Sequence, residues 1–321
     1  MSIPLSSLRN KHGYVRQFDT LKFDPRSSRM RVLSGFLLLV STTASASLDV
    51  VRRASDLYQR TAYAGSLRIL AADPAPDAAG YLLTGKNYFM SGDYKKAVEF
   101  FEKAVAASAT DSEFELWLGR AWGRRAETSG WLTAASHASK ARQCFEKAIA
   151  LDPGNREAKN DLFSFYLNAP GFLGGGLDKA EVAAKTIALE RPAQYENEEA
   201  EIADKKKDYS AAEAHFRHAM ELAPNEPGRM LDLARYLAKR KRLNESDQLF
   251  EQAEKMFPGQ PKVAFAEAAV DIENSRNLKK ARALLEEYLH ANLTPDDPPR
   301  QEAEKLLRRI GGSGSSGSSK D

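Results

Sequence analysis

Apolar residues recur along most of the chain at steps of three and four, the spacing of one face of an α-helix. One pattern repeats: a small residue, a bulky apolar residue four positions on, usually a small residue three further, and usually a proline five later. Its copies are Ala97-Phe101-Ala104, Ala141-Phe145-Ala148-Pro153, Ala180-Ala184-Ile187-Pro192, Ala212-Phe216-Ala219-Pro224, Ser246-Phe250-Ala253-Pro258 and, more loosely, Ala281-Leu285-Tyr288. Because proline cannot continue a helix, each copy predicts a helix that ends in a turn.

A second helix is predicted upstream of each copy. Tyr81, Gly85 and Tyr88 precede the first copy at helical spacing, and the pair Leu118-Gly119 precedes the second. Asp93 and Asp208 lie in the turns just before a copy begins, where an Asp side chain can accept hydrogen bonds from free backbone N–H groups. The unit that repeats is therefore a helix-turn-helix hairpin, and the fold class is all-α.

The segment Tyr81…Gly85…Tyr88…Ala97…Phe101…Ala104 resembles the signature of the tetratricopeptide repeat family. The closing units also show the period of that family, because Phe216 and Phe250 are 34 residues apart, as are Pro224 and Pro258. The resemblance covers roughly residues 78–290 and implies a right-handed superhelical solenoid of tandem hairpins. We expect six to seven hairpins over residues 47–310, with a degenerate first hairpin at 48–73 and a terminal capping helix at 298–310.

Residues 30–46 (MRVLSGFLLLVSTTASA) have the order of a secretory signal peptide: one basic residue, a nine-residue apolar run and a small-residue box that ends at Ala46. The apolar run is shorter than the ~20 residues that span a bilayer. Residues 1–29 are polar and lack periodicity, so we expect translation to start at Met30. Export from a bacterial cell, to the periplasm or the medium, is the favoured location. The alternatives are an uncleaved N-terminal membrane anchor and a cytoplasmic scaffold.

Charge and motifs argue against several classes of function. Residues 1–46 carry seven of the 47 basic residues and two of the 44 acidic ones, so 40 basic and 42 acidic residues remain after Ala46. That balance argues against nucleic-acid binding, which needs clustered positive charge. Of the five histidines only His215 and His218 are close, and Cys144 is the single cysteine. Without an HExxH or GxSxG motif, we predict no enzyme activity, no metal and no cofactor.

The resemblance implies that the first helices of the hairpins line a concave groove that binds a protein or peptide. Carried over by position, the groove residues are Leu82, Lys86, Phe89, Leu116, Arg120, Asn160, Ser164, Asn197, Glu201, Leu231 and Arg235. The family's clamp for carboxylates, a Lys and an Asn, is not reproduced, because Leu82 and Lys86 take those positions. A glycan-binding or small-molecule-binding accessory subunit is the alternative. Clustered aromatic platforms would favour it, whereas charged and amide side chains favour a peptide.

Two units break the period between their helices. The spacing from the glycine position to the next helix is twelve in the first unit, but twenty-two from Gly119 to Ala141 and seventeen from Phe163 to Ala180. About ten residues are therefore inserted around 124–139 and five within 169–176. We expect two neighbouring edge loops with apolar tips, Trp131 and Phe172, that either pack together or form a lip at the groove. The tail 311–321 (GGSGSSGSSKD) is expected to be flexible.

Overall fold

The computed structural model describes residues 47–312, which contain only helices and turns. Residues 47–59 are helical, and the helices that follow are α2 (Tyr63–Leu70), α3 (Ala78–Met90), α4 (Tyr94–Ala107), α5 (Ser112–Thr128), α6 (Trp131–Leu151), α7 (Arg156–Asn168), the short 3-10 helix η1 (Gly171–Leu173), α8 (Leu177–Lys185), α9 (Pro192–Lys205), α10 (Tyr209–Leu222), α11 (Pro227–Lys239), α12 (Leu243–Met256), α13 (Pro261–Glu273), α14 (Leu278–His290) and α15 (Arg300–Gly312). The leader at 30–46 lies outside the described residues, as does most of the tail. The first residues of that tail, Gly311 and Gly312, belong to α15.

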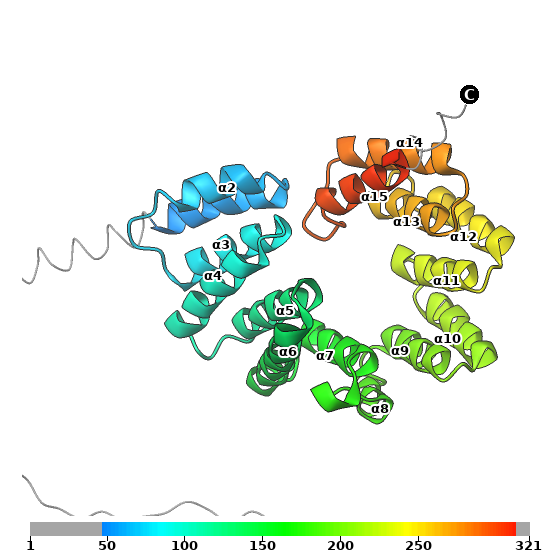
Figure 1. Cartoon of the computed structure of the whole chain (residues 1–321), viewed down its shortest axis with the longest axis horizontal. Helices are drawn as coiled ribbons and strands as arrows, with labels where there is room; N and C mark the ends of the chain where they lie inside the picture. The colour runs from blue at the N-terminus through cyan, green and yellow to red at the C-terminus, as the bar shows by residue number, and fades with distance from the viewer. Residues whose placement is uncertain (1–46, 313–321) are drawn as a thin grey trace, which may run out of the picture. The chain divides into compact units, whose positions relative to one another are not determined.

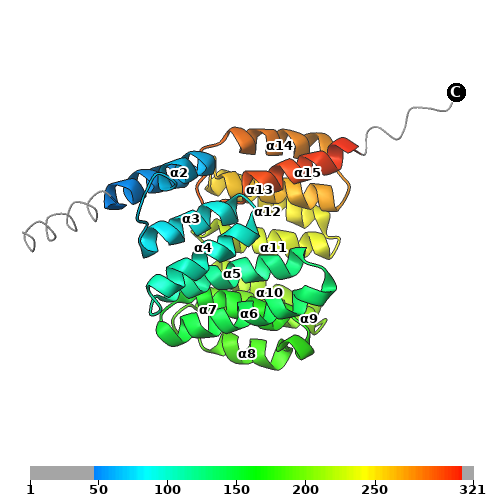
Figure 2. The ribbon, with the colours of Figure 1, turned by 60° about the vertical axis from the view of Figure 1, so that its left-hand side comes forward.

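The helices pair into hairpins that follow one another along a curved path (Figure 1). The first helices, α3, α5, α7, α9, α11 and α13, form the inner wall, and the second helices form the outer wall. Figure 2 shows the same hairpins stacked from α2 down to α8 and back up to α14. The predicted fold class, an all-α solenoid of tandem hairpins, is confirmed.

Capping Asp side chains lie at the start of two of the second helices, α4 and α10. The carboxylate of Asp93 accepts a hydrogen bond from the backbone N–H of Lys96 at 3.1 Å, ahead of α4. Asp208 accepts from Ala211 in the same way ahead of α10, also at 3.1 Å. These bonds satisfy N–H groups that the first turn of a helix leaves without a partner. The two caps predicted from the sequence are confirmed.

Inside a hairpin, glycine on one helix receives a phenylalanine from the other. A Cβ atom added to Gly85 would lie 2.5 Å from ring carbons of Phe101, which is fully buried. The α7–α8 hairpin reverses these sizes, because Phe163 takes the glycine position and packs in one apolar cluster with Ala184, which takes the bulky position. The same volume is filled from the opposite helix, as close packing requires.

The expected loop around residues 124–139 is wrong. α5 continues to Thr128 and α6 begins at Trp131, so only Ser129 and Gly130 connect them. The insertion lengthens both helices, because this stretch is rich in alanine and other good helix formers. Contacts continue along the extension, where the rings of Trp122 and His137 lie 5.1 Å apart. The side chain of Trp131 is not among those that the structure describes, so its packing stays a prediction.

The insertion within residues 169–176 forms a tight turn around η1. A Cβ atom on Gly175 would lie 1.9 Å from the carbonyl oxygen of Ala169, so this position requires glycine. The backbone N–H groups of Gly174, Gly175 and Gly176 donate to carbonyl oxygens of this same segment and α7. Phe172, at its tip, is 85% exposed and therefore does not pack into the hairpin.

Candidate binding groove

The inner wall of the solenoid encloses a groove with two connected parts. The wider part has a volume of about 1790 Å³ and is lined by residues of α3, α5, α6, α7, α13 and α15. The narrower part, about 460 Å³, lies among α7, α9, α11 and α13. Both parts are lined by Asn168, Ala269 and Glu273, which makes them continuous.

Trp117 of α5 is the centre of an aromatic and cationic cluster in the wider part. Its ring meets Phe89 edge-on, with centroids 5.4 Å apart and planes at 82°. Lys86 Nζ lies 5.0 Å and the Arg120 guanidinium carbon 4.9 Å from the Trp117 ring centroid. Arg120 also donates to Asp161 at 2.6 Å. The cations are therefore held between the indole and neighbouring carboxylates, as cation–π and ion-pair interactions both favour.

The narrower part combines apolar walls with carboxylates. Phe216 and Tyr236, whose ring centroids are 5.0 Å apart, stand beside Glu201 and Asp232. Burial, together with the nearby Asp232 carboxylate, raises the pKa of Glu201 to about 7. Burial also raises the pKa of Asp232, although Arg235 and Arg229 oppose the shift. Half-buried carboxylates of this kind disfavour their own charge and favour an incoming cation.

Comparison with known proteins bears on this architecture. The model of the tetratricopeptide repeat matches residues 78–111 and 197–226, which contain the α3–α4 hairpin and most of the α9–α10 hairpin. The chain contains tetratricopeptide repeats. A search of curated proteins found no match.

Solved tetratricopeptide repeat proteins share the fold. One from Parabacteroides merdae is 11% identical, with a TM-score of 0.53 over 83% of this chain and 99% of that one. A thermophilic one from Thermus thermophilus is 19% identical, with a TM-score of 0.48 over 63% and 99% of the two chains. Yeast Tom70 is 17% identical, with a TM-score of 0.49 over 78% and 49%. Of these three, the Parabacteroides protein alone exceeds a TM-score of 0.5, and at 11% identity that likeness shows the fold alone.

Four of the predicted groove residues are buried instead of exposed to the groove. Leu82, Leu116, Leu231 and Asn197 are buried, with exposed fractions of 9%, 3%, 2% and 5%. Leu82 and Leu116 belong to the apolar cluster that joins the first two repeats. Leu231 belongs to another apolar cluster, and Asn197 hydrogen-bonds Glu201 of its own helix, so the structure does not support these four positions as partner contacts.

The other predicted groove residues are distributed along the inner wall. Phe89, Arg120 and Ser164 line the wider part, and Glu201 and Arg235 line the narrower part. Two residues line neither part and already have partners. Lys86 pairs with Glu113 at 2.5 Å, and the side-chain oxygen of Asn160 accepts a hydrogen bond from Arg191 at 2.9 Å.

Sequence reasoning missed several groove residues. Trp117, Arg120 and Arg124 follow one another at i, i+3 and i+7 on α5, which places them on a single face. Only Arg120 was predicted, although the helical spacing itself could have identified the other two. Phe265 and the inner side of α15 also line the wider part, and no local signal in the sequence indicates that.

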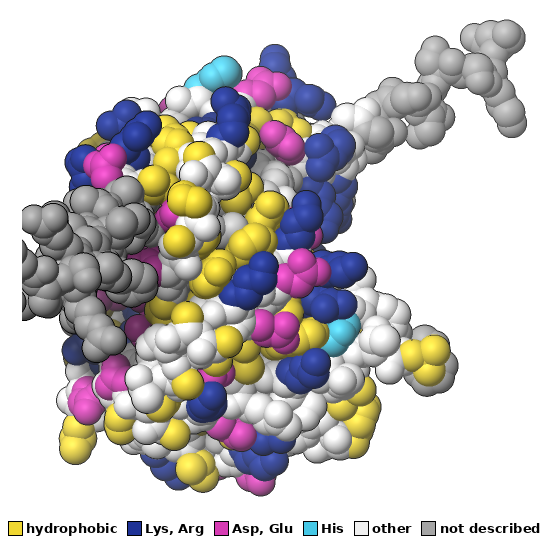
Figure 3. Space-filling view, turned by 90° about the vertical axis from the view of Figure 1, so that its left-hand side faces the viewer, with side chains coloured by type: hydrophobic (Ala, Val, Ile, Leu, Met, Phe, Trp, Pro, Cys, Tyr) yellow, Lys and Arg dark blue, Asp and Glu magenta, His cyan; other side chains and the backbone are white. Residues whose placement is uncertain are grey.

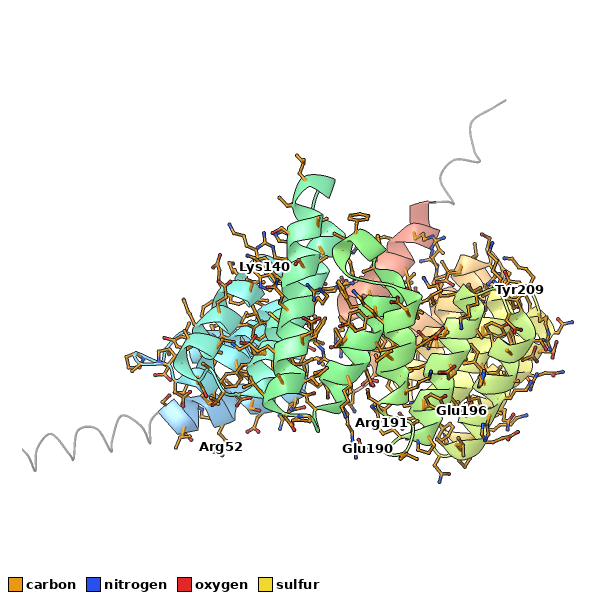
Figure 4. All side chains as sticks on the ribbon, turned by 90° about the horizontal axis from the view of Figure 1, so that it is seen from below. Arg52, Lys140, Glu190, Arg191, Glu196 and Tyr209 are labelled. Carbon is orange, nitrogen blue, oxygen red and sulfur yellow. The ribbon has the colours of Figure 1, made fainter. Side chains whose placement is uncertain are left out.

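The two neighbouring histidines of α10 form ion pairs or hydrogen bonds with one carboxylate. His215 Nδ1 lies 2.6 Å from one oxygen of Glu196 and His218 Nδ1 lies 3.2 Å from the other. Glu196 belongs to α9, as Figure 4 shows, so the cluster links the two helices of one hairpin. Among residues 47–312, no group of three or more His, Cys, Asp or Glu side chains is placed to hold a metal ion.

Two further observations concern the described surface and helices. On the face seen in Figure 3, Lys and Arg side chains are interspersed with Asp and Glu around a band of apolar side chains. None of the helices in the described part of the chain is both long and apolar enough to cross a bilayer. The absence of nucleic-acid binding stays a prediction.

Proposed function

We propose that this tetratricopeptide repeat protein is a protein-interaction scaffold that holds an extended segment of a partner along its concave groove. The observation that carries the proposal is the continuous groove, about 1790 Å³ in its wider part, with aromatic and charged side chains side by side. Aromatic rings provide apolar contact area, and Arg and carboxylate groups recognise backbone and charged side chains. The repeats themselves support the coarser assignment of an interaction scaffold.

The arrangement of Trp117 favours a peptide over a glycan. A sugar ring needs an open aromatic face on which to stack. The Trp117 ring is already contacted by Lys86 and Arg120 and meets the edge of Phe89. The charged groups of the groove, in contrast, suit the alternating donors and acceptors of an extended peptide.

The proposed location is the bacterial cell envelope, and the leader at residues 30–46 supports it. Intact-mass measurement on protein purified from its native host tests this part independently of binding. Processing after Ala46 leaves Ser47 as the new N-terminus. A full-length chain in the cytoplasmic fraction would contradict export.

A photo-crosslinking amino acid in the groove tests the binding site. Ser164 is exposed and lines the wider part, so a benzoylphenylalanine there disturbs no packed side chain. Leu189, which is 99% exposed and lines neither part of the groove, is the matched control position. We expect a discrete adduct, formed in intact cells, from position 164 and not from position 189. The same adducts from both positions, or none from either in a folded protein, would refute a groove-bound partner.

A further inference from the structure

The last helix, α15, meets the rest of the solenoid at two unequal surfaces. On one side it packs against the last hairpin: Ala303 is fully buried and Ile310 is 9% exposed, in one apolar cluster with Leu285, Tyr288 and Leu293. The hydrophobic effect stabilises this side, because apolar area is removed from water. α15 is therefore fixed to α13 and α14.

On its other side, α15 meets the first hairpins through three polar contacts. The side chain of Arg300 donates to Thr61 Oγ1 at 3.4 Å. A Cβ atom added to Gly92 would lie 3.0 Å from Gln301 Oε1, which places that side chain against the α3–α4 turn. Glu302 lies 3.8 Å from Arg124 of α5. We name these three pairs the closing contact.

No apolar cluster of the described residues spans the closing contact, although the hydroxyl of Tyr63 lies near Asp297 and Arg300. The apolar cluster that contains Ala54, Tyr58 and Leu83 ends within the first hairpins, and the cluster of α15 ends within the last. Arg124 is already positioned by other partners: it donates to the hydroxyl of Tyr94 and pairs with Glu127 at 2.5 Å. Its pair with Glu302 is therefore an addition to a preformed cluster, and an exposed ion pair of that length contributes little free energy.

The apolar packing of α15 on the last hairpin is stronger than the polar closing contact, so the closing contact should separate first. We propose that the closing contact is a gate: α15 stays on the last hairpin while its contact with the first hairpins opens and closes, and a partner segment enters the groove in the open state. Gln301, Glu302 and Lys305 line the wider part together with Tyr94 and Arg124, so separation of the two sides widens the groove itself. The solenoid accommodates the movement because small rotations between repeats add up along the array. The entry of a partner rests on the proposed function, whereas the opening does not.

A distance measurement between the first and last hairpins tests the opening. Spin labels are placed at Arg60 and Glu286, both exposed, in a Cys144→Ala background that removes the single native thiol. Glu302→Gln removes the charge that meets Arg124. Glu304→Gln is the matched control, because Glu304 makes the same change on α15 but pairs only with Arg308 one turn further on, also at 3.8 Å.

At low salt we expect a dominant short-distance population and a minor longer-distance population, in equal proportions in the parent and in Glu304→Gln. Glu302→Gln, or about 0.5 M NaCl on the parent, should increase the longer-distance population about two- to fivefold, the effect of losing one exposed ion pair. Thr61→Glu, which offers Arg300 a carboxylate, should decrease it. Parent-like distributions in Glu302→Gln and at high salt would overturn the gate. Equal shifts in Glu302→Gln and Glu304→Gln would also overturn it, because they would report the stability of α15.

The crosslink from position 164 distinguishes failure of the gate from failure of the proposed function. If the gate controls entry, adduct yield rises in Glu302→Gln and falls in Thr61→Glu, in parallel with the long-distance population. A long-distance population that responds as expected, with no adduct in any variant, keeps the gate and refutes the groove-bound partner. Adduct yield that is the same in all variants while the distances change overturns the control of entry.

Discussion

Replacing two glycines of the same helix by alanine should have opposite effects on stability. Gly119 and Gly123 are one turn apart on α5, and alanine favours a helix over glycine by ~1 kcal/mol at either position. At Gly123 the added Cβ would meet only Ala141, at 4.0 Å, which is an ordinary contact. Gly123→Ala should therefore stabilise the protein by up to ~1 kcal/mol.

At Gly119 the same methyl group enters occupied space. Its Cβ would lie 2.7 Å from Cε1 and 2.8 Å from Cδ1 of Phe145, and 3.1 Å from Cβ of Cys144. Phe145 is buried and cannot swing into solvent, so α5 and α6 must separate. Overpacking of this kind costs ~1–3 kcal/mol. Because the helix-propensity gain is common to both variants, that cost is the difference expected between Gly119→Ala and Gly123→Ala.

Thermal unfolding followed by circular dichroism measures the difference. A change of 1 kcal/mol shifts the Tm of a domain of this size by roughly 2–4 °C, so Gly119→Ala should melt roughly 2–12 °C below Gly123→Ala. Phe145→Leu frees space beside Gly119, and the double variant should lose less stability than the two single losses combined. Equal Tm values for Gly119→Ala and Gly123→Ala would refute the close approach of α5 and α6 and the glycine–phenylalanine pairing inferred from it.

Three other expectations concern stability. Phe216→Ala and Phe250→Ala each remove a buried ring and should lower the free energy of unfolding by about 3–5 kcal/mol in urea titrations; neutral results would show that the assigned packing face is wrong. Burial raises the pKa of Glu198 to about 7 from 4.5, so the folded state retains a proton that the unfolded state loses and stability falls as pH rises from 4.5 through 7. Glu198→Gln should therefore match the parent near pH 4 and exceed it at pH 8 by at most about 3 kcal/mol, and a pH-independent difference would contradict this. Phe172→Ala should leave the Tm unchanged because the ring is exposed, and a clear loss would show that it is packed.

The fold was predictable because its packing rule is local. Each hairpin pairs a small residue with a bulky one at fixed helical spacing, and the chain repeats the pair often enough to identify it. The rule also holds where the residues differ, since Phe163 and Ala184 exchange the sizes of Gly85 and Phe101. A residue that breaks the small-or-bulky pattern in one helix is therefore compensated by a residue of the opposite size in the other helix of the same hairpin.

The insertion near residue 130 was misassigned because residue counting gives length and not conformation. About three extra helical turns, shared between α5 and α6, add the same number of residues between Gly119 and Ala141 as a ten-residue loop. Composition separates them, because the inserted stretch contains many good helix formers and only one glycine before α6 begins. The 169–176 insertion, rich in glycine and with a proline, was predicted to be a loop, and its one helical element is the short 3-10 helix η1.

The groove was predicted only in part, because a helix rotates about 100° per residue. A position carried over with an error of one residue moves from the groove to the core, and Leu116 and Trp117 show both outcomes. Family positions identify the correct helix more reliably than the correct side chain. The i, i+3, i+7 series of Trp117, Arg120 and Arg124 is a better guide, because it is read from this chain alone.

The closing contact could not be predicted from any local feature. Arg300 and Thr61 are 239 residues apart, and their meeting depends on the rotation contributed by every hairpin between them. The closing contact cannot itself set that curvature, because it is small and polar, whereas each hairpin buries an apolar cluster. Packing within the repeats therefore brings the ends together, and the polar pairs only respond to it. A change of packing in the middle of the array therefore alters the groove in two ways. It moves the part of the groove wall that the changed hairpin forms, and it changes the distance between Arg124 and Glu302.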